Sequence, residues 1–309
     1  MKHISNFLIF LFFLVSCAPV QTTKSPPAVI RTPVTFQPTI TTIPPTLTTV
    51  SEVCDPFTTD FCITDGHFIL HRPIKSPAND LVDSTYPYGS TANGTREPHH
   101  GVEFLNKFGT PVHAAGEGVV IFAGPDTEAI YSPWQNFYGN LVVIKHDNGL
   151  FTLYAHLSKM DVDVDQAVQV GDKIGEVGQS GVATGSHLHF EVRHGDGQDY
   201  FSTENPELWL IPAKDLFGTL AISVVDEHLQ HVHYAEFTVK YYPDKTQPPV
   251  KSRYGVTYPA DMPNGVENAV LGDLPPGSYR IALKHNGQLY ERWVDVESGK
   301  LTQVVFVVE

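Results

Sequence analysis

The chain has 309 residues, enough for two ordinary domains and additional segments. It contains 24 Gly, 24 Pro, 18 Phe and 13 Tyr, and only 17% of its residues are charged, which favours β-rich, turn-rich structure over helix bundles. The 34 acidic residues outnumber the 20 Lys and Arg, giving a formal charge of −14 without any basic run. We therefore expect no nucleic-acid partner, because phosphate binding needs clustered Lys and Arg.

The N-terminus, MKHISNFLIFLFFLVSC, has the pattern of an export signal. Lys2 precedes an apolar core at residues 7–15 that is too short for a stable membrane anchor. The sequence LVSC at residues 14–17 resembles a bacterial lipobox, which implies cleavage before Cys17 and a lipid on its thiol. A plain secretory signal and an N-terminal membrane anchor are the alternatives. We predict a lipoprotein signal peptide at residues 1–16 and an extracytoplasmic protein that is lipid-anchored to a bacterial membrane.

Residues 17–50 are predicted to be a lipid-anchored linker. Residues 18–50 include 7 Pro and 10 Thr and no acidic residue. Such a segment cannot bury enough apolar surface to offset its ordering entropy. Pro-rich chain extends by about 3.1 Å per residue, so the linker can reach roughly 100 Å. This length favours a globular part that works away from the membrane.

Two cysteines, Cys54 and Cys62, remain after the lipidated one. An even pair in an exported chain predicts a disulfide, which would contribute about 2–3 kcal/mol on the chain-entropy estimate. Two free buried thiols are the alternative. The gap between the two residues and the lack of further cysteines exclude a Cys-based metal site.

Residues 51–212 are predicted to form a first domain of antiparallel strands. Short β-type runs recur there, separated by Gly, Asn and Asp, and Asp147-Asn148-Gly149 between two of them is a hairpin signal. We find no strong run of helical periodicity in this region.

Residues 213–309 are predicted to form a small β-sandwich. Their apolar and polar residues alternate with a period of two, and Asn286-Gly287 separates two such runs. The pattern is similar to the immunoglobulin-like or carboxypeptidase-regulatory-like modules that are appended to many exported enzymes. The predicted fold class is thus all-β throughout.

Five side chains between residues 99 and 194 suggest a metal site. His99 and Glu103 are four apart and His187 and His189 are two apart, so each pair can share one face of a strand. His156 ends the apolar run LFTLYAH. Catalytic zinc takes three ligands from His and carboxylate side chains and keeps a fourth position for water. The set therefore contains enough ligands for zinc, and the remaining imidazoles could hydrogen-bond the water or an oxyanion.

Four segments in order resemble the lysostaphin/LytM-type zinc metallopeptidases, the M23 peptidase family. The first motif of that family, H-x-G-x-D, corresponds to HHGVE at residues 99–103. Its later motifs correspond to GTPVHAAGEGVVIFAG (109–124), YGNLVVIKHDNGLFTLYAHLS (138–158) and VQVGDKIGEVGQSGVATGSHLHFEVR (168–193). The resemblance covers residues 85–194 and keeps the order and spacing of the motifs.

Carried over residue by residue, the resemblance implies that His99, Glu103 and His189 bind Zn2+ and that His156 and His187 are catalytic. It implies a two-layer antiparallel β-sheet peptidase domain that hydrolyses peptide bonds of peptidoglycan stem or bridge peptides. No other cofactor is expected, and we expect a monomer.

Two features depart from the family pattern. The carboxylate is usually Asp, whereas Glu103 carries one more methylene, and a displacement near 1 Å can reduce a rate on the order of 100-fold. The loop 125–138, PDTEAIYSPWQNFY, is longer than is common in the family. Its aromatic residues could line a substrate groove or pack on one another. His100 is expected to face away from the metal.

Two other functions stay open at this point. A catalytically degenerate member could bind cell wall or activate another hydrolase, although such proteins usually lose several of the His positions that this chain keeps. Alternatively, the C-terminal sandwich could be the working part of a binding lipoprotein.

Overall fold

The computed structural model describes residues 54–213, 216–263 and 265–309. The predicted signal peptide, Cys17 and the linker lie outside the described residues. The described residues belong to one compact unit, Glu52–Glu309. They contain no α-helix, one short 3-10 helix and 18 strands, so the predicted all-β class is confirmed. None of their helical segments is long and apolar enough to span a membrane.

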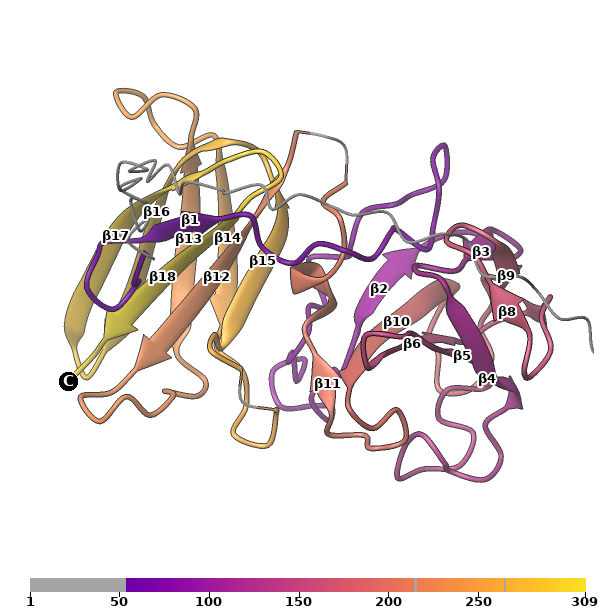
Figure 1. Cartoon of the computed structure of the whole chain (residues 1–309). Helices are drawn as coiled ribbons and strands as arrows, with labels where there is room; N and C mark the ends of the chain where they lie inside the picture. Colours follow the sequence, from indigo (N-terminus) through magenta and orange to yellow (C-terminus); the bar gives the residue numbers. More distant parts are fainter. Residues whose placement is uncertain (1–53, 214–215, 264) are drawn as a thin grey trace, which may run out of the picture. The chain divides into compact units, whose positions relative to one another are not determined.

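The strands fall into two groups along the chain (Figure 1). Strand β1 (Cys62–Thr64) comes first in the chain but lies in Figure 1 with the second group, beside β18. The first group is β2 (Val102–Leu105), β3 (Pro111–His113), β4 (Gly118–Pro125), β5 (Asn140–Lys145), β6 (Leu150–Ala155), β7 (Lys159–Met160), β8 (Ala167–Val168), β9 (Lys173–Glu176), β10 (His187–His194) and β11 (Thr203–Glu204). The 3-10 helix η1 (Pro206–Leu208) follows. The second group is β12 (Gly218–Val225), β13 (Glu236–Tyr242), β14 (Lys251–Val256), β15 (Ala269–Leu274), β16 (Gly277–His285), β17 (Gln288–Val296) and β18 (Leu301–Val307).

Two antiparallel sheets form the first layered body. The larger has the order β11-β10-β6-β5-β4-β8, with β2 also paired to β10, and the smaller has the order β3-β9-β7. One apolar core contains residues of both sheets, among them Val112, Ile174 and Phe190. The predicted turn at residues 147–149 connects β5 and β6. The predicted two-layer antiparallel arrangement is confirmed.

Strands in the middle of the larger sheet are buried on both faces. Val142 and Ile144 of β5 join the core that the two sheets share, whereas Leu141 and Val143 join a second cluster with Tyr138 on the opposite face. Burying one such aliphatic side chain contributes about 1.5–3 kcal/mol. Strand β10 places the side chains of His187 and His189 on the same face as this second cluster, where the ring of Tyr138 lies beside that of His189.

The second layered body is a β-sandwich of two four-stranded sheets, β1-β18-β12-β15 and β14-β13-β16-β17, with one apolar core built from both. Asn286 and Gly287 join β16 to β17 with φ of 46° and 84°, as an Asn-Gly hairpin turn requires. Two pairings were not predicted. Strand β12 runs parallel to β18, and β1, which lies within the range assigned to the first domain, pairs with β18.

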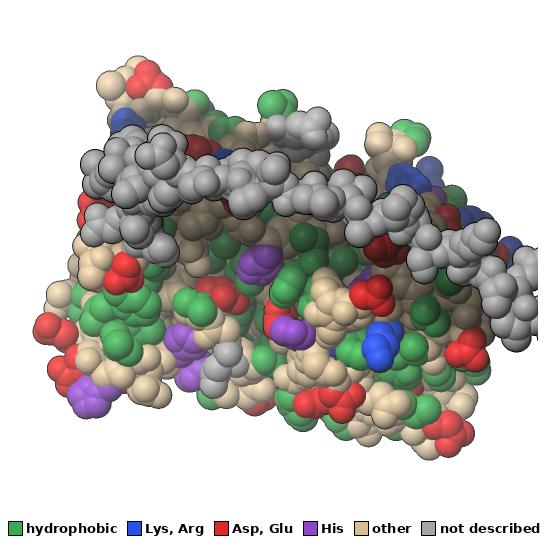
Figure 2. All heavy atoms as spheres, in the orientation of Figure 1, with side chains coloured by type: hydrophobic (Ala, Val, Ile, Leu, Met, Phe, Trp, Pro, Cys, Tyr) green, Lys and Arg blue, Asp and Glu red, His purple; other side chains and the backbone are tan. Residues whose placement is uncertain are grey.

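The face shown in Figure 2 carries scattered acidic side chains and few basic ones, as the formal charge of −14 implies. Histidine side chains also reach this surface.

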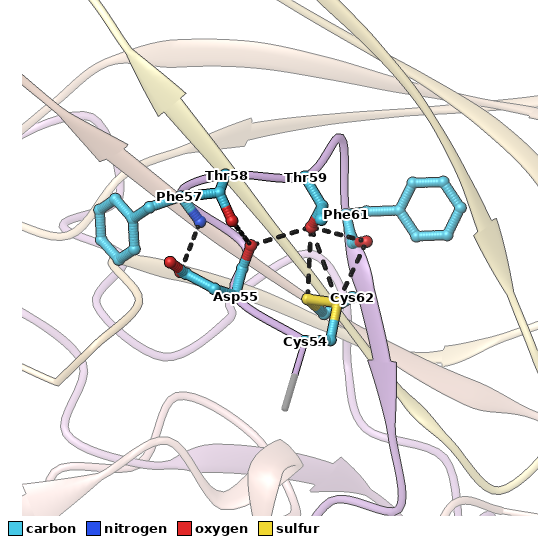
Figure 3. The surroundings of a disulfide bond; sticks show 7 residues. All are labelled: Cys54, Asp55, Phe57, Thr58, Thr59, Phe61 and Cys62. Atoms are coloured by element: carbon cyan, nitrogen blue, oxygen red, sulfur yellow. Dashed lines mark hydrogen bonds between the residues drawn. A yellow bond between two sulfur atoms is a disulfide. The ribbon is translucent and has the colours of Figure 1, made fainter. Parts of the chain in front are cut away.

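The predicted disulfide is present and links Cys54 to Cys62, the first residue of β1 (Figure 3). Within its loop, the carbonyl oxygen of Asp55 accepts hydrogen bonds from the hydroxyls of Thr58 and Thr59 at 3.1 and 2.9 Å. The disulfide therefore closes a turn that is already hydrogen-bonded, directly before the chain joins the sandwich.

Replacing both cysteines with Ser is expected to lower the free energy of unfolding by about 2–3 kcal/mol, because the open chain regains loop entropy when it unfolds. Urea unfolding with and without a reducing agent measures this change. Reductant should destabilise the native chain and leave the double variant unchanged. Equal stability of the native chain under both conditions would contradict the prediction.

Candidate metal centre

Three separate segments bring the candidate residues together. Strand β10 carries His187 and His189 and pairs with β2 so that His189 lies directly opposite Glu103. On its other edge β10 pairs with β6, and His189 lies opposite Ala155. Ala155 is the last residue of β6, so His156 directly follows the end of β6 beside His189. The even spacing on β10 places both histidines on one face, while Leu188 and its neighbours of the same parity enter the core.

His99, Glu103 and His189 form a compact triangle of donor atoms. Nε2 of His99 lies 3.0 Å from Oε1 of Glu103 and 3.1 Å from Nδ1 of His189. Nδ1 of His189 lies 3.2 Å from the same carboxylate oxygen. Two ligands of a tetrahedral zinc ion, each at about 2.0–2.1 Å from the metal, are about 3.3 Å apart. The three donors therefore have the spacing of one zinc-binding site, and all three side chains are buried.

The backbone around His99 does not have the predicted strand conformation. We predicted that His99 and Glu103 share one strand, but β2 begins only at Val102. His99 precedes the strand and is held instead by the backbone of residues 89 and 90. The predicted common strand was therefore wrong, although the two side chains do converge.

Each of the four imidazoles uses one ring nitrogen outside the site. Their partners are oxygen atoms, so that nitrogen carries a proton, and the other nitrogen is the one that can bind a metal or take up a second proton. The pairs are His99 Nδ1 with Tyr86 O (3.1 Å), His156 Nδ1 with Ser180 O (2.8 Å), His187 Nδ1 with Gly185 O (2.8 Å) and His189 Nε2 with Glu191 Oε1 (2.9 Å). Outer partners of this kind orient metal ligands in general.

Glu103 lies against the inner nitrogens of His99, His187 and His189. Oε2 of Glu103 lies 2.8 Å from Nε2 of His187, yet this buried oxygen accepts no hydrogen bond of normal geometry. Burial by itself would raise the pKa of Glu103, but His189, His187 and His99 hold it well below its usual range. An ionised carboxylate beside several imidazole nitrogens attracts a cation, either protons or a metal, so the donor set fits a divalent metal ion. The extra methylene of Glu103 does not prevent its oxygen from reaching both nitrogen ligands.

Behind His189 lies a buried network of charges. Glu191 accepts hydrogen bonds from His189, from the hydroxyl of Tyr138 at 2.6 Å and from Nε of Arg193 at 2.9 Å. Burial alone would raise the pKa of Glu191, whereas Arg193 and His189 lower it to about 2. Burial alone would likewise lower the pKa of His189, but Glu103 and Glu191 raise it to about 9. The network thus favours positive charge at His189, whether it comes from a proton or from a metal.

His156 has an unusual backbone conformation, with a φ of 61°. Its N–H donates to Tyr138 O at 2.9 Å, and its ring lies 4.9 Å from that of His187. Left-handed conformations outside glycine are uncommon and tend to occur at functional sites. Burial and the neighbouring imidazoles lower the pKa of His156 to about 3, so this imidazole is neutral at physiological pH.

A cavity of about 450 Å³ opens over the cluster. Trp134 and Phe137 of the loop 125–138 line it, whereas Tyr131 and Tyr138 of the same loop are buried in the adjacent apolar cluster. The aromatic residues of this loop therefore do both things that were considered: some line the groove, and others pack in the apolar cluster. Tyr200, which follows β10 in the chain, also lines the cavity.

His100 is not one of the three donors, since its Nδ1 interacts with Oγ1 of Thr203 at 3.1 Å. Glu191 and Arg193 were not predicted as partners of the site. Their signal was present, because they continue the two-residue period of His187 and His189 along the same face of β10. Tyr86, which stacks on His99, had no local signal of this kind.

A β-sheet domain with two imidazoles and one carboxylate converging on a point, and two more imidazoles beside it, defines the ligand set of a mononuclear zinc hydrolase. Comparisons with known proteins agree with this class. Residues 97–201 match the model of Peptidase family M23. This stretch of the chain is therefore similar to the domain of that family.

Similar curated proteins include the peptidoglycan DD-endopeptidase ShyA of Vibrio cholerae and the DD-carboxypeptidase/endopeptidase Mpg of Neisseria meningitidis. Each is 42% identical over 95 residues, which are 31% of this chain and 20% of the relative. The chain thus spans about a fifth of the length of these relatives.

Similar solved structures include a zinc-containing peptidase from Vibrio cholerae, which is 31% identical with a TM-score of 0.35 and covers 42% of this chain and 38% of that one. A mutant catalytic domain of the M23 protein EnpA from Enterococcus faecalis is 27% identical with a TM-score of 0.37, covering 43% and 92%.

Gly101→Ala is expected to weaken zinc binding by at least about tenfold, because a ligand displaced by about 1 Å loses its geometry. A Cβ at residue 101 would lie 2.5 Å from Phe190 O and 2.8 Å from Cε1 of His189, so β10 would have to move. Competition with a chelator measures the affinity. Gly185→Ala is the control, since a Cβ there meets nothing within 4 Å. Unchanged affinity in Gly101→Ala would refute this close-packing argument.

Glu191→Gln is expected to weaken zinc binding by about 10–100-fold, because it removes the charge that polarises His189 and leaves the guanidinium of Arg193 uncompensated. Metal affinity and thermal stability should both fall. Glu117→Gln removes the same charge from an exposed side chain and should change neither. If Glu191→Gln binds zinc as tightly as that control, the buried network does not support the metal.

Proposed function

We propose that this protein is a zinc-dependent endopeptidase that hydrolyses peptide bonds of peptidoglycan stem or bridge peptides. In the same proposal it is tethered to the cell envelope by a lipid on Cys17, through the linker 17–50. The named activities of the curated relatives support the substrate class, and the lipobox-like sequence supports the tether.

The observation that carries the proposal is the set of four imidazoles around Glu103. Each has its proton committed to an outer oxygen, so the inward-facing nitrogens are prepared to bind a metal or to accept a proton. His99 and His189, with Glu103, would hold zinc. When bound, zinc supplies a Lewis acid that polarises a carbonyl and lowers the pKa of water.

His156 and His187 would perform the proton transfers. Nδ1–H of each donates to a backbone carbonyl, so Nε2 is the nitrogen left to accept the proton of an attacking water molecule. After accepting it, the same Nε2–H can donate the proton to the leaving amine nitrogen. Both side chains line the cavity, and His187 contacts the carboxylate of the metal site.

The cavity suits a peptide better than a long apolar ligand. Aromatic side chains such as Trp134 and Tyr200 line it together with the charged residues Arg96 and Glu97. Aromatic faces can pack on short side chains, and charged groups can bind the carboxylate and amino groups in which wall peptides are rich.

The test combines zinc content by elemental analysis with release of peptides from purified cell wall. Native protein should hold one zinc per chain and cut the wall peptides. His189→Ala should lose both properties, because two ligands do not retain the metal. His156→Ala should keep zinc and lose at least about 100-fold in rate, as expected for a residue that transfers protons.

Two further variants address the carboxylate, and one serves as a control. Glu103→Asp should retain zinc, since Asp is usual in the family, whereas Glu103→Ala should lose it. His228→Ala changes an exposed imidazole and should be neutral. Native protein without metal at neutral pH would refute the proposal. Native protein that binds zinc without cutting the wall would support the degenerate alternative.

A further inference from the structure

A short loop outside any strand holds the ligand His99. The N–H of Gly89 donates to His99 O at 2.8 Å, and the N–H of His99 donates to Ser90 O at 3.0 Å. The ring of Tyr86 stacks on the imidazole at 4.2 Å, and the carbonyls of Tyr86 and Pro87 face Nδ1 at 3.1 and 3.3 Å. The loop of residues 86–90 therefore sets the position, the plane and the tautomer of this ligand.

The same loop is supported from its other side by Tyr258. Tyr88 packs against Tyr258 with ring centroids 5.2 Å apart, and its hydroxyl donates to Thr203 O at 3.0 Å. Gly89 lies so close that a Cβ there would be 2.6 Å from Cδ1 of Tyr258, and its φ is 77°. The residue that bonds to His99 is thus in direct contact with Tyr258.

Tyr258 belongs to the part of the chain that builds the C-terminal sandwich, between β14 and β15. Its N–H donates to Asn268 O at 2.7 Å, and the side chain of Asn268 bonds to both backbone groups of Val224 in β12. The hydroxyl of Tyr258 accepts a hydrogen bond from Nδ2 of Asn205 at 2.8 Å. The ring of Tyr258 is buried and packs in the apolar core of the first layered body. Tyr258 is therefore fixed at both its backbone and its hydroxyl.

Two other contacts hold the same regions together. Arg72 makes a bidentate ion pair with Asp273 of β15, at 2.6 and 3.0 Å. The N–H of Gly272 donates to the buried carboxylate of Glu207 at 2.8 Å. A module that served only as a spacer or as a separate wall-binding unit would need none of these buried contacts.

We infer that the C-terminal sandwich is a structural part of the metal centre, and that Tyr258 is a positioning residue for the ligand His99. It acts through Tyr88 and Gly89 on the loop of residues 86–90. The consequence for metal affinity rests on the proposed zinc site, whereas the mechanical support of the loop does not.

The first arm of the test uses the whole chain without metal. Amide hydrogen exchange of Gly89 and His99 should be at least about tenfold faster in Tyr258→Ala than in native protein, because their hydrogen bonds lose support. Tyr258→Phe keeps the ring and should restore exchange to within about threefold of native protein. Tyr254→Ala, which removes an exposed ring of the same sandwich, is the control. If Tyr258→Ala does not fold, Tyr258→Leu replaces it in both arms.

The second arm measures zinc affinity by chelator competition. Tyr258→Ala should bind zinc about tenfold or more weakly, while Tyr258→Phe and Tyr254→Ala should bind as native protein does. Because coupling is reciprocal, zinc should slow exchange of the Tyr258 and Asn268 amides in native protein.

The outcomes separate the two proposals. Native protein that binds no zinc refutes the proposed function, and the metal-free exchange still decides the present inference. Unchanged exchange at Gly89 and His99 in Tyr258→Ala overturns the inference whether or not zinc binds. Faster exchange with unchanged zinc affinity overturns the inference that Tyr258 affects metal binding.

Discussion

The register of β2 against β10 is the constraint on which the site depends. It places Glu103 directly opposite His189, and a slip of one residue would turn Glu103 toward the core. Phe104 and Phe190 prevent such a slip, because both are fully buried on the other face of the same two strands. Apolar packing on one face of the sheet therefore sets the geometry of polar chemistry on the other.

The polar face has its own requirement, which is charge balance in a buried environment. Two carboxylates, Glu103 and Glu191, flank His189, and the guanidinium of Arg193 neutralises the outer one. A buried charge without a partner is strongly destabilising, so the members of this network depend on one another. A cation beside Glu103 completes the balance, which is why stability and metal binding are linked here.

Local sequence patterns predicted a large part of this structure. Alternating residues predicted the all-β class, Asn-Gly and Asp-Asn-Gly predicted two hairpins, and the even spacing of His187 and His189 predicted their common face. The patterns failed where pairing involves distant segments. They did not predict that β1 pairs with β18, that β12 runs parallel to β18, or that His99 lies before its strand. Periodicity reports which face a residue occupies, but it does not identify the neighbouring strand.

The sequence by itself supplied the candidate residues, because the resemblance of its motifs to a known family implied the ligands His99, Glu103 and His189 and the additional imidazoles of His156 and His187. The tertiary structure decided which ring nitrogen of each histidine faces inward, since the outer oxygen partners belong to other segments. It also decided that the loop of His99 is supported by Tyr258, which lies 159 positions further along the chain. Such contacts follow from the packing of whole sheets, and no local pattern records them.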